Sequence, residues 1–255
     1  HGTARLLVQI SQQQPLLLVP HAARLLRTLH SAAKHERSDA ARSAYNAAAA
    51  QVARGASAEM LAKVVGELRE RYTSDEGGVE DSTRLSVAAM VRELLRGATD
   101  AMNRVQVDWV PLAFLGKHEP RTQQEVADAP TAAQKAERGK LASLWLEAYD
   151  EAGIGPSKLT LHLPEIIDLL TQVVNGPSWA LRRAAAHCLL DLHKELPKEA
   201  LGRLPAEKAA MGELAALLRD KRWRDKEGEA AAEIERLGNL VRPPAKVAAD
   251  GKAVE

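Results

Sequence analysis

A basic residue recurs near the start of the second helix in each of five predicted helical pairs. These residues are separated by 42, 56, 42 and 44 positions, and they are Arg42, Arg84, Lys140, Arg182 and Lys226. Apolar residues at helical spacing mark both members of each pair. A unit that returns at a steady period buries its apolar face only against its neighbours, so the sequence predicts a stack of helical pairs.

A period of about 40–47 residues built from two helices is typical of HEAT and armadillo repeats. The predicted fold class is therefore all-α, a HEAT-repeat α-solenoid of about five helical pairs within residues 1–242. The expected repeats are 15–54, 57–98, 99–152, 160–196 and 205–241. Residues 243–255 are polar and rich in Ala and Lys, and we expect them to form a disordered tail.

Local signals set the expected helix boundaries. Ser38, Ser57 and Ser178 each precede an apolar-striped segment, as N-cap residues do. The helix after Ser38 carries a narrow stripe of small residues, which would let neighbouring helices approach closely: Ala41, Ala44, Ala48 and Val52.

The third repeat is irregular. Its first helix is expected over 99–115, with Pro111 inside it, where a proline should kink or end the helix. A polar insert follows at 117–134 and shows no apolar period; such loops are usually functional or mobile. Trp145 then falls on an apolar stripe and should be part of the core. For Trp109, Trp179 and Trp223 two interpretations remain, either a plug between repeats or an exposed anchor for a partner.

Composition and motifs favour a binding protein over an enzyme. The formal net charge of +1 argues against a general nucleic-acid or membrane-surface binder, and a single cysteine excludes an internal disulfide. No phosphate loop, nucleophile elbow or zinc signature is present. His187, Cys188 and His193 are interpreted as packing residues, and the Glu165–Asp168 pair as a solvated face. We therefore expect no catalytic residues, no metal and no cofactor.

The sharpest surface feature is a basic turn around one tryptophan, expected between the helices of the fifth repeat. Its residues are the candidate partner-binding set: Arg219, Lys221, Arg222, Trp223 and Arg224. Arginine binds carboxylates in a bidentate geometry, so this turn would suit an acidic protein partner. An ordinary solvated turn remains the alternative.

Several phrases resemble one known family. Residues 109–119 (WVPLAFLGKHE) are similar to the phrase P-L-x-F-L-G-x-H-E of the large proteasome-associated HEAT-repeat adaptor and scaffold protein family. The phrases at 144–147 (LWLE), 163–166 (LPEI), 178–182 (SWALR) and 222–227 (RWRDKE) follow in the same order as in that family. The resemblance spans roughly residues 37–240 and implies that the chain is a fragment of the C-terminal half of such a protein.

The resemblance implies a non-catalytic adaptor that binds the 26S proteasome. Such a protein would bridge the core and regulatory particles, modulate their assembly, quality control and activity, and reside in the cytoplasm and nucleus. Its partners would be proteasome subunits, with no nucleic acid and no membrane insertion. The alternative is another HEAT-repeat interaction scaffold, such as a transport receptor or a phosphatase or kinase scaffold, because a shared fold does not fix function.

Overall fold

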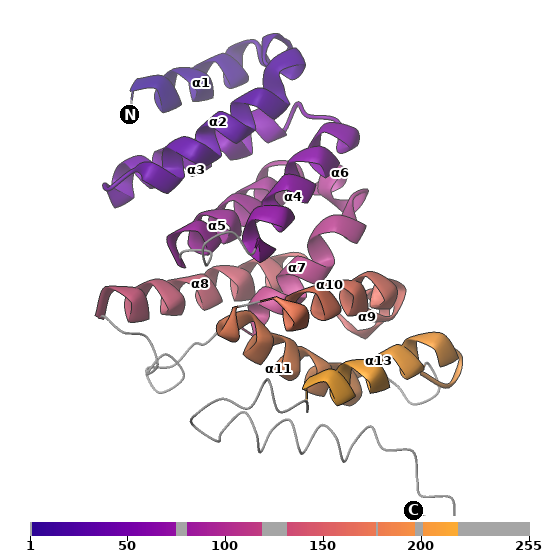
Figure 1. The fold of residues 1–255 in the computed structure, drawn as a ribbon. Helices are drawn as coiled ribbons and strands as arrows, with labels where there is room; N and C mark the ends of the chain where they lie inside the picture. Colours follow the sequence, from indigo (N-terminus) through magenta and orange to yellow (C-terminus); the bar gives the residue numbers. More distant parts are fainter. Residues whose placement is uncertain (1, 75–80, 119–131, 177, 197–200, 219–255) are drawn as a thin grey trace, which may run out of the picture.

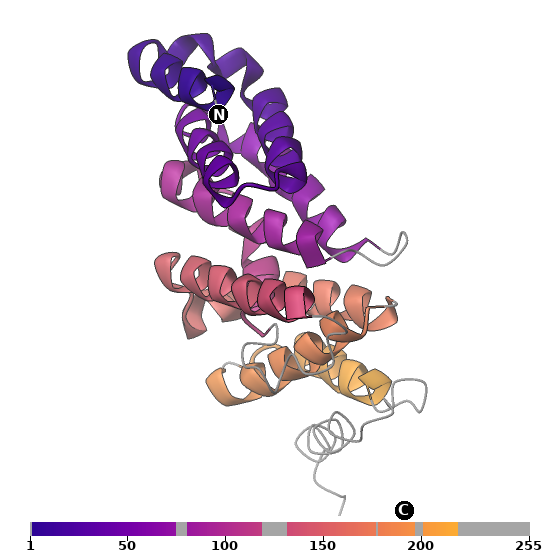
Figure 2. The ribbon, with the colours of Figure 1, turned by 90° about the vertical axis from the view of Figure 1, so that its left-hand side faces the viewer.

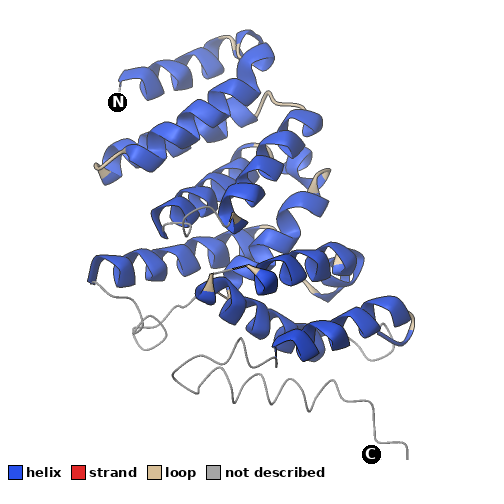
Figure 3. Ribbon diagram, viewed as in Figure 1, coloured by secondary structure: helices blue, strands red, loops and turns tan. Residues whose placement is uncertain are grey.

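The chain folds into an elongated stack of helices with α1 at one end and α13 toward the other (Figure 1). The computed structural model describes residues 2–74, 81–118, 132–176, 178–196 and 201–218. Every regular element within these ranges is helical, and they contain no strand (Figure 3). The all-α prediction is confirmed.

The helices follow one another in antiparallel pairs. The first two pairs comprise α2 (Ala22–His35) with α3 (Asp39–Ala53), and α4 (Ala58–Thr73) with α5 (Asp81–Gly97). In the third pair the first member is divided into α6 (Thr99–Asn103) and α7 (Gln106–Lys117), and the second is α8 (Ala132–Glu151). The remaining helices are α9 (Pro156–Leu161), α10 (Leu163–Asn175), α11 (Trp179–Glu195) and α13 (Pro205–Leu218).

The pairs build two layers, which are visible as the stack is turned (Figure 2). In one layer α3 packs against α5, and α5 packs against α8. In the other layer α2, α4, α7, α10 and α13 contact one another in that order. One helix that the sequence prediction left unassigned, α1 (Gly2–Gln13), packs against α3 and is followed by two short 3-10 turns, η1 (Pro15–Leu17) and η2 (Val19–His21).

The predicted N-caps are confirmed. The hydroxyl of Ser57 accepts a hydrogen bond from the backbone N–H of Met60 at 3.2 Å. The hydroxyls of Ser38 and Ser178 accept equivalent bonds at 3.4 Å. Each cap satisfies one of the N–H groups that a helix start leaves without an intrahelical partner, which fixes where α3, α4 and α11 begin.

The recurring basic residues occupy an equivalent position in successive second helices. Arg42, Arg84 and Arg182 are each the fourth residue of their helix, in α3, α5 and α11. Lys140 lies further along the longer helix α8, which follows the predicted insert and accounts for the long interval. Lys226 lies outside the described residues.

Two tryptophans lie in the core. Trp145 is fully buried, as its position on the apolar stripe predicts. Trp109 is also fully buried, and its indole N–H donates to the carbonyl oxygen of Met102 at 2.8 Å, which supports the interpretation as a plug. The side chain of Trp179 and all of Trp223 lie outside what the structure describes.

Pro111 does not end its helix, which was one of its two predicted effects. Helix α7 runs through Pro111, and the chain instead breaks before it, between Asn103 and Gln106. A proline inside a helix leaves the carbonyl four residues earlier without its donor. Here that carbonyl belongs to Val107, a residue in the first turn of α7 that is 43% exposed.

Helix α3 makes a very close contact with α5 at Ala50, a small residue outside the predicted stripe. A Cβ placed on Gly97, at the end of α5, would lie 2.1 Å from the carbonyl oxygen of Ala50. Ala48 and Ala49 are fully buried beside it. The two backbones therefore meet with no side chain between them.

The predicted insert, fifth repeat and tail are only partly covered by the described residues. Helix α7 continues to Lys117, two residues beyond the predicted 99–115 helix, and α8 already begins at Ala132, so both helices extend into the predicted insert 117–134. Residues 119–131 lie outside the described residues. So do the second helix of the fifth repeat and the tail at 243–255, and these predictions stand as made.

Candidate protein-binding surface

The basic turn singled out in the sequence lies outside the described residues. Arg219, Lys221, Arg222, Trp223 and Arg224 all follow the end of α13 at Leu218. The structure therefore neither places nor groups these side chains, and the turn stays a predicted partner-binding site. The surface features below come from the described part of the chain.

A groove crosses the layer of second helices. It encloses a cavity of about 730 Å³ between the last turn of α2, the N-terminal half of α3, and the facing sides of α5 and α8. This volume lies in the range of about 300–1,000 Å³ that is usual for binding pockets. We call it the α3–α5–α8 groove, defined by Arg42 and Asn46 of α3, Leu85 and Arg92 of α5, and Lys140 and Glu147 of α8.

Helical spacing explains how the groove is lined. Arg42 and Asn46 are four residues apart, and so are Leu85 and Ala89, so each pair presents one face of its helix. Leu85 and Ala89 are buried and form an apolar floor, joined by the half-buried Leu144 of α8. Sequence reasoning missed this groove because its three walls come from three successive repeats.

Charged side chains at one side of the groove link α3 to α8. Arg42 donates from Nη2 to the backbone carbonyl of Glu36 at 3.1 Å and lies 3.6 Å from the carboxylate of Asp39. The other carboxylate oxygen of Asp39 is 4.0 Å from Nζ of Lys140. The side chains of Asp39 and Lys140 are mostly exposed, so this side opens to solvent.

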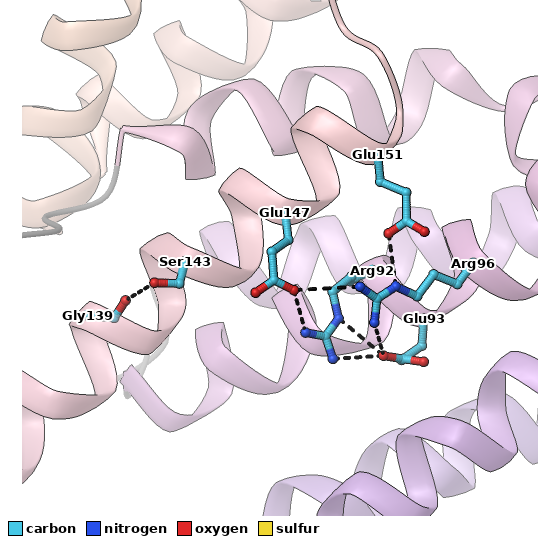
Figure 4. Close-up of polar contacts among 7 residues, drawn as sticks. All are labelled: Arg92, Glu93, Arg96, Gly139, Ser143, Glu147 and Glu151. Atoms are coloured by element: carbon cyan, nitrogen blue, oxygen red, sulfur yellow. Dashed lines mark hydrogen bonds and ion pairs between the residues drawn. The ribbon is translucent and has the colours of Figure 1, made fainter.

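An ion-pair network closes the other end, between α5 and α8 (Figure 4). Arg92 donates to Glu147 across the helices at 2.9 Å and to Glu93 on its own helix at 2.8 Å. Arg96 pairs with Glu151 at 2.9 Å, and this contact raises the pKa of Arg96 above its usual value. Because the pairs connect neighbouring repeats, they favour one register of α5 against α8.

Asn46 is the unusual polar residue of the groove. Its side chain is buried, and Oδ1 has no hydrogen-bond partner among the described residues. Buried polar groups are nearly always hydrogen-bonded, so each exception calls for an explanation. Asn46 therefore supplies the groove with an amide oxygen that makes no hydrogen bond to another described residue.

A buried histidine lies beneath the groove and joins three helices. Arg71 of α4 lies 3.0 Å from Nδ1 of His30, and Ser86 of α5 lies 3.1 Å from its Nε2. Arginine only donates, so Nδ1 accepts and Nε2 donates to the hydroxyl of Ser86, which in turn donates a hydrogen bond to the carbonyl oxygen of Thr83 at 2.9 Å. Burial, reinforced by the charges of Arg71 and Lys34, lowers the pKa of His30 to about 4.

A second polar cluster ties the end of α7 to α11. Nζ of Lys117 lies 3.2 Å from Asp191 and 3.4 Å from Glu195, and Nε2 of His118 lies 3.1 Å from Asp191. These partners hold the pKa of Asp191 well below its usual range, whereas burial lowers the pKa of His118. Lys117 also lies 4.5 Å from the centre of the Tyr149 ring. Sequence spacing could not indicate this cluster, because Lys117 and His118 lie more than 70 residues before Asp191 and Glu195.

The residues weighed as metal or acid–base candidates have ordinary surroundings. Cys188 is fully buried, with its thiol 3.5 Å from the carbonyl oxygen of Phe114, so the packing interpretation holds for it. His187 stacks on His118 at 6.3 Å, and burial lowers the pKa of His193. Asp168 is exposed and Glu165 half-buried on α10. No group of three metal-ligating side chains gathers in the described part of the chain.

Comparison with known proteins points in one direction. Residues 1–73, which include α1 to α4, match the family model described as "Proteasome adapter and scaffold protein ECM29, HEAT-repeat domain". The human "Proteasome adapter and scaffold protein ECM29" is 24% identical over 195 residues. The chain is similar to part of ECM29. That alignment covers 76% of this chain and 10% of the human protein, so the chain spans about a tenth of the length of this relative.

The ECM29-like character agrees with the stack of helical pairs, since the matching domain is a HEAT-repeat domain. The matched residues 1–73 precede the phrase at 109–119, so the two likenesses rest on different parts of the chain. No solved structure matches the chain.

Among the described helices, none is both long enough and apolar enough to cross a membrane.

Proposed function

We propose that the chain is part of a non-catalytic scaffold that binds the 26S proteasome, bridging its core and regulatory particles and modulating its assembly, quality control and activity. The observation that carries the proposal is the pair of matches to the ECM29 adapter and scaffold protein. The fold agrees with it, since a solenoid offers an extended surface for other proteins. A cytoplasmic and nuclear location belongs to the same proposal.

Affinity purification of the full-length protein that carries this chain tests the proposal. The tagged protein is recovered from cell extract, and the co-purifying proteins are identified by mass spectrometry. Recovery of both core and regulatory particle subunits in near-equal amounts supports a bridging scaffold. The alternative HEAT-repeat scaffold would be supported if proteasome subunits are absent. Transport cargo, or phosphatase or kinase subunits, would then be recovered in their place.

The basic turn is proposed as one contact of that scaffold. Neutralising Arg219, Lys221, Arg222 and Arg224 together in the full-length protein should weaken proteasome recovery more at low salt than at high salt, because high salt already screens the charge contacts of the wild type. Trp223→Ala is the companion variant that tests an apolar anchor. If both variants recover as much proteasome as the wild type, the turn is an ordinary solvated turn and does not bind the proteasome.

A further inference from the structure

We propose that the α3–α5–α8 groove binds an extended acidic peptide segment of a protein partner. This inference does not depend on whether that partner is the proteasome. It follows from the charge, the shape and the unused hydrogen-bonding capacity of the groove.

The charge of the groove indicates that its partner is negatively charged. Five Lys or Arg residues line the groove against three Asp or Glu residues. Within the described residues, no carboxylate pairs with Lys34 or with the exposed Arg37, whereas Arg42, Arg92 and Lys140 already face Asp39 or Glu147. The groove therefore has two cations to offer at the α2 side, and carboxylates are their natural partners.

The length of the groove suits an extended chain. It crosses α3, α5 and α8, which come from three successive pairs. Packed helices lie about 8–10 Å apart, so three of them span roughly 16–20 Å. An extended peptide advances about 3.3 Å per residue, and five or six residues would cross the groove.

Asn46 suits the backbone of such a peptide. No hydrogen bond joins its Oδ1 to another described residue, so turning the amide toward a ligand breaks no bond made by that oxygen. An amide both donates and accepts, which matches the N–H and C=O of an extended chain. The apolar floor of Leu85, Ala89 and Leu144 would pack against the methylene groups of the peptide.

The same lining disfavours nucleic acid. Glu36, Asp39 and Glu147 lie in the groove and would repel a continuous line of phosphates. Among the described residues, the groove lining also contains no Trp, Tyr or Phe, the side chains on which unpaired bases usually stack. A peptide with spaced carboxylates avoids both difficulties.

Fluorescence anisotropy of the 255-residue chain tests the proposal. The probe is a fluorescein-labelled ten-residue peptide of alternating Glu and Ser, compared with a Gln–Ser peptide and with a ten-nucleotide oligothymidine. The groove variants are Lys34→Glu with Arg37→Glu, and Asn46→Ala. The matched control reverses two exposed arginines away from the groove, Arg54→Glu with Arg203→Glu. Circular dichroism confirms that each variant is folded.

We expect the Glu–Ser peptide to bind about tenfold more tightly than the Gln–Ser peptide at low salt, and less tightly as salt rises. The Lys34–Arg37 double reversal should lower its affinity about tenfold, Asn46→Ala about threefold, and the control less than twofold. Equal binding of both peptides, no binding at all, or equal losses in the groove and control reversals would overturn the proposal. So would tighter binding of oligothymidine that the groove reversal abolishes, because this would assign the groove to nucleic acid.

Discussion

The indole N–H of Trp145 donates a hydrogen bond to the hydroxyl of Tyr72 at 3.1 Å, and the two rings meet edge to face with centroids 5.5 Å apart. Both side chains are fully buried, and they come from α4 and α8, which belong to neighbouring repeats. One polar contact and one aromatic contact thus join two repeats at the same point of the core.

Tyr72→Phe should destabilise the chain by about 1–2 kcal/mol. The ring contact survives, but the indole N–H of Trp145 loses its acceptor inside the core, and an unsatisfied buried donor costs more than an average hydrogen bond contributes. Urea denaturation followed by circular dichroism measures the change. Tyr45→Phe, at a half-buried tyrosine of α3, is the control and should shift the free energy of unfolding by less than about 0.5 kcal/mol.

Two glycine-to-alanine changes should have opposite signs. A Cβ on Gly116 would lie 2.3 Å from the Trp145 ring, so Gly116→Ala forces a buried ring to move and should cost roughly 1–3 kcal/mol. A Cβ on Gly66, inside α4, meets nothing within 4 Å, so Gly66→Ala should stabilise by about 0.5–1 kcal/mol. Thermal melting compares them, and a higher melting temperature for Gly116→Ala would contradict the packing described here.

His30 should make the stability of the chain fall as the pH drops. Its pKa is about 4 in the folded chain, against an ordinary value of 6.5. Between these values the unfolded chain takes up a proton and the folded chain does not. The contribution of neutral His30 is therefore fully present above pH 6.5 and is lost as the pH falls toward 4, by about 2–3 kcal/mol in all.

Urea midpoints at pH 7.5 and pH 5.0 measure this loss, and His30→Gln supplies the comparison. Burial also lowers the pKa of His118 and His193, so the wild-type chain carries a background dependence of the same sign. The part due to His30 is the difference between the two chains. If the His30→Gln variant loses as much stability on acidification as the wild type, the assignment to His30 is wrong.

The α5–α8 ion pairs should contribute little individually and should respond to salt. Arg96 and Glu151 are both roughly 40% exposed at the side chain, so a double-mutant cycle with alanine should give a coupling of about 0.5 kcal/mol or less. The coupling should shrink between about 0.05 M and 1 M NaCl. A coupling above about 2 kcal/mol, independent of salt, would show that the pair is far better shielded than its exposure indicates.

The elements that the sequence predicted well are those decided within a few residues. Ser38, Ser57 and Ser178 act as caps through bonds to N–H groups three positions away, and the stripe that holds Trp145 follows from helical spacing alone. Pro111 does not end its helix, although a proline removes one backbone hydrogen bond. Whether the packing of a helix outweighs that local cost is a tertiary property, which local propensity does not contain.

The groove and the buried clusters could not be predicted for a related reason. His30 meets Ser86 and Arg71 at separations of 56 and 41 residues, and Lys117 meets Asp191 at a separation of 74. Such meetings depend on the rotation of each helix about its axis and on how one pair is offset from the next. Sequence spacing gives the face that a residue shares, but not which faces of different repeats come together.

The backbone contact between Gly97 and Ala50 has a geometric consequence for the whole rod. Each helical pair touches only its neighbours, so the angle at one joint is carried to everything beyond it, as in a lever. A methyl group at position 97 would push α5 away from α3 and swing the two ends of the stack apart by a distance that grows with its length. The absence of a side chain at Gly97 thus sets the angle between the two parts of the stack.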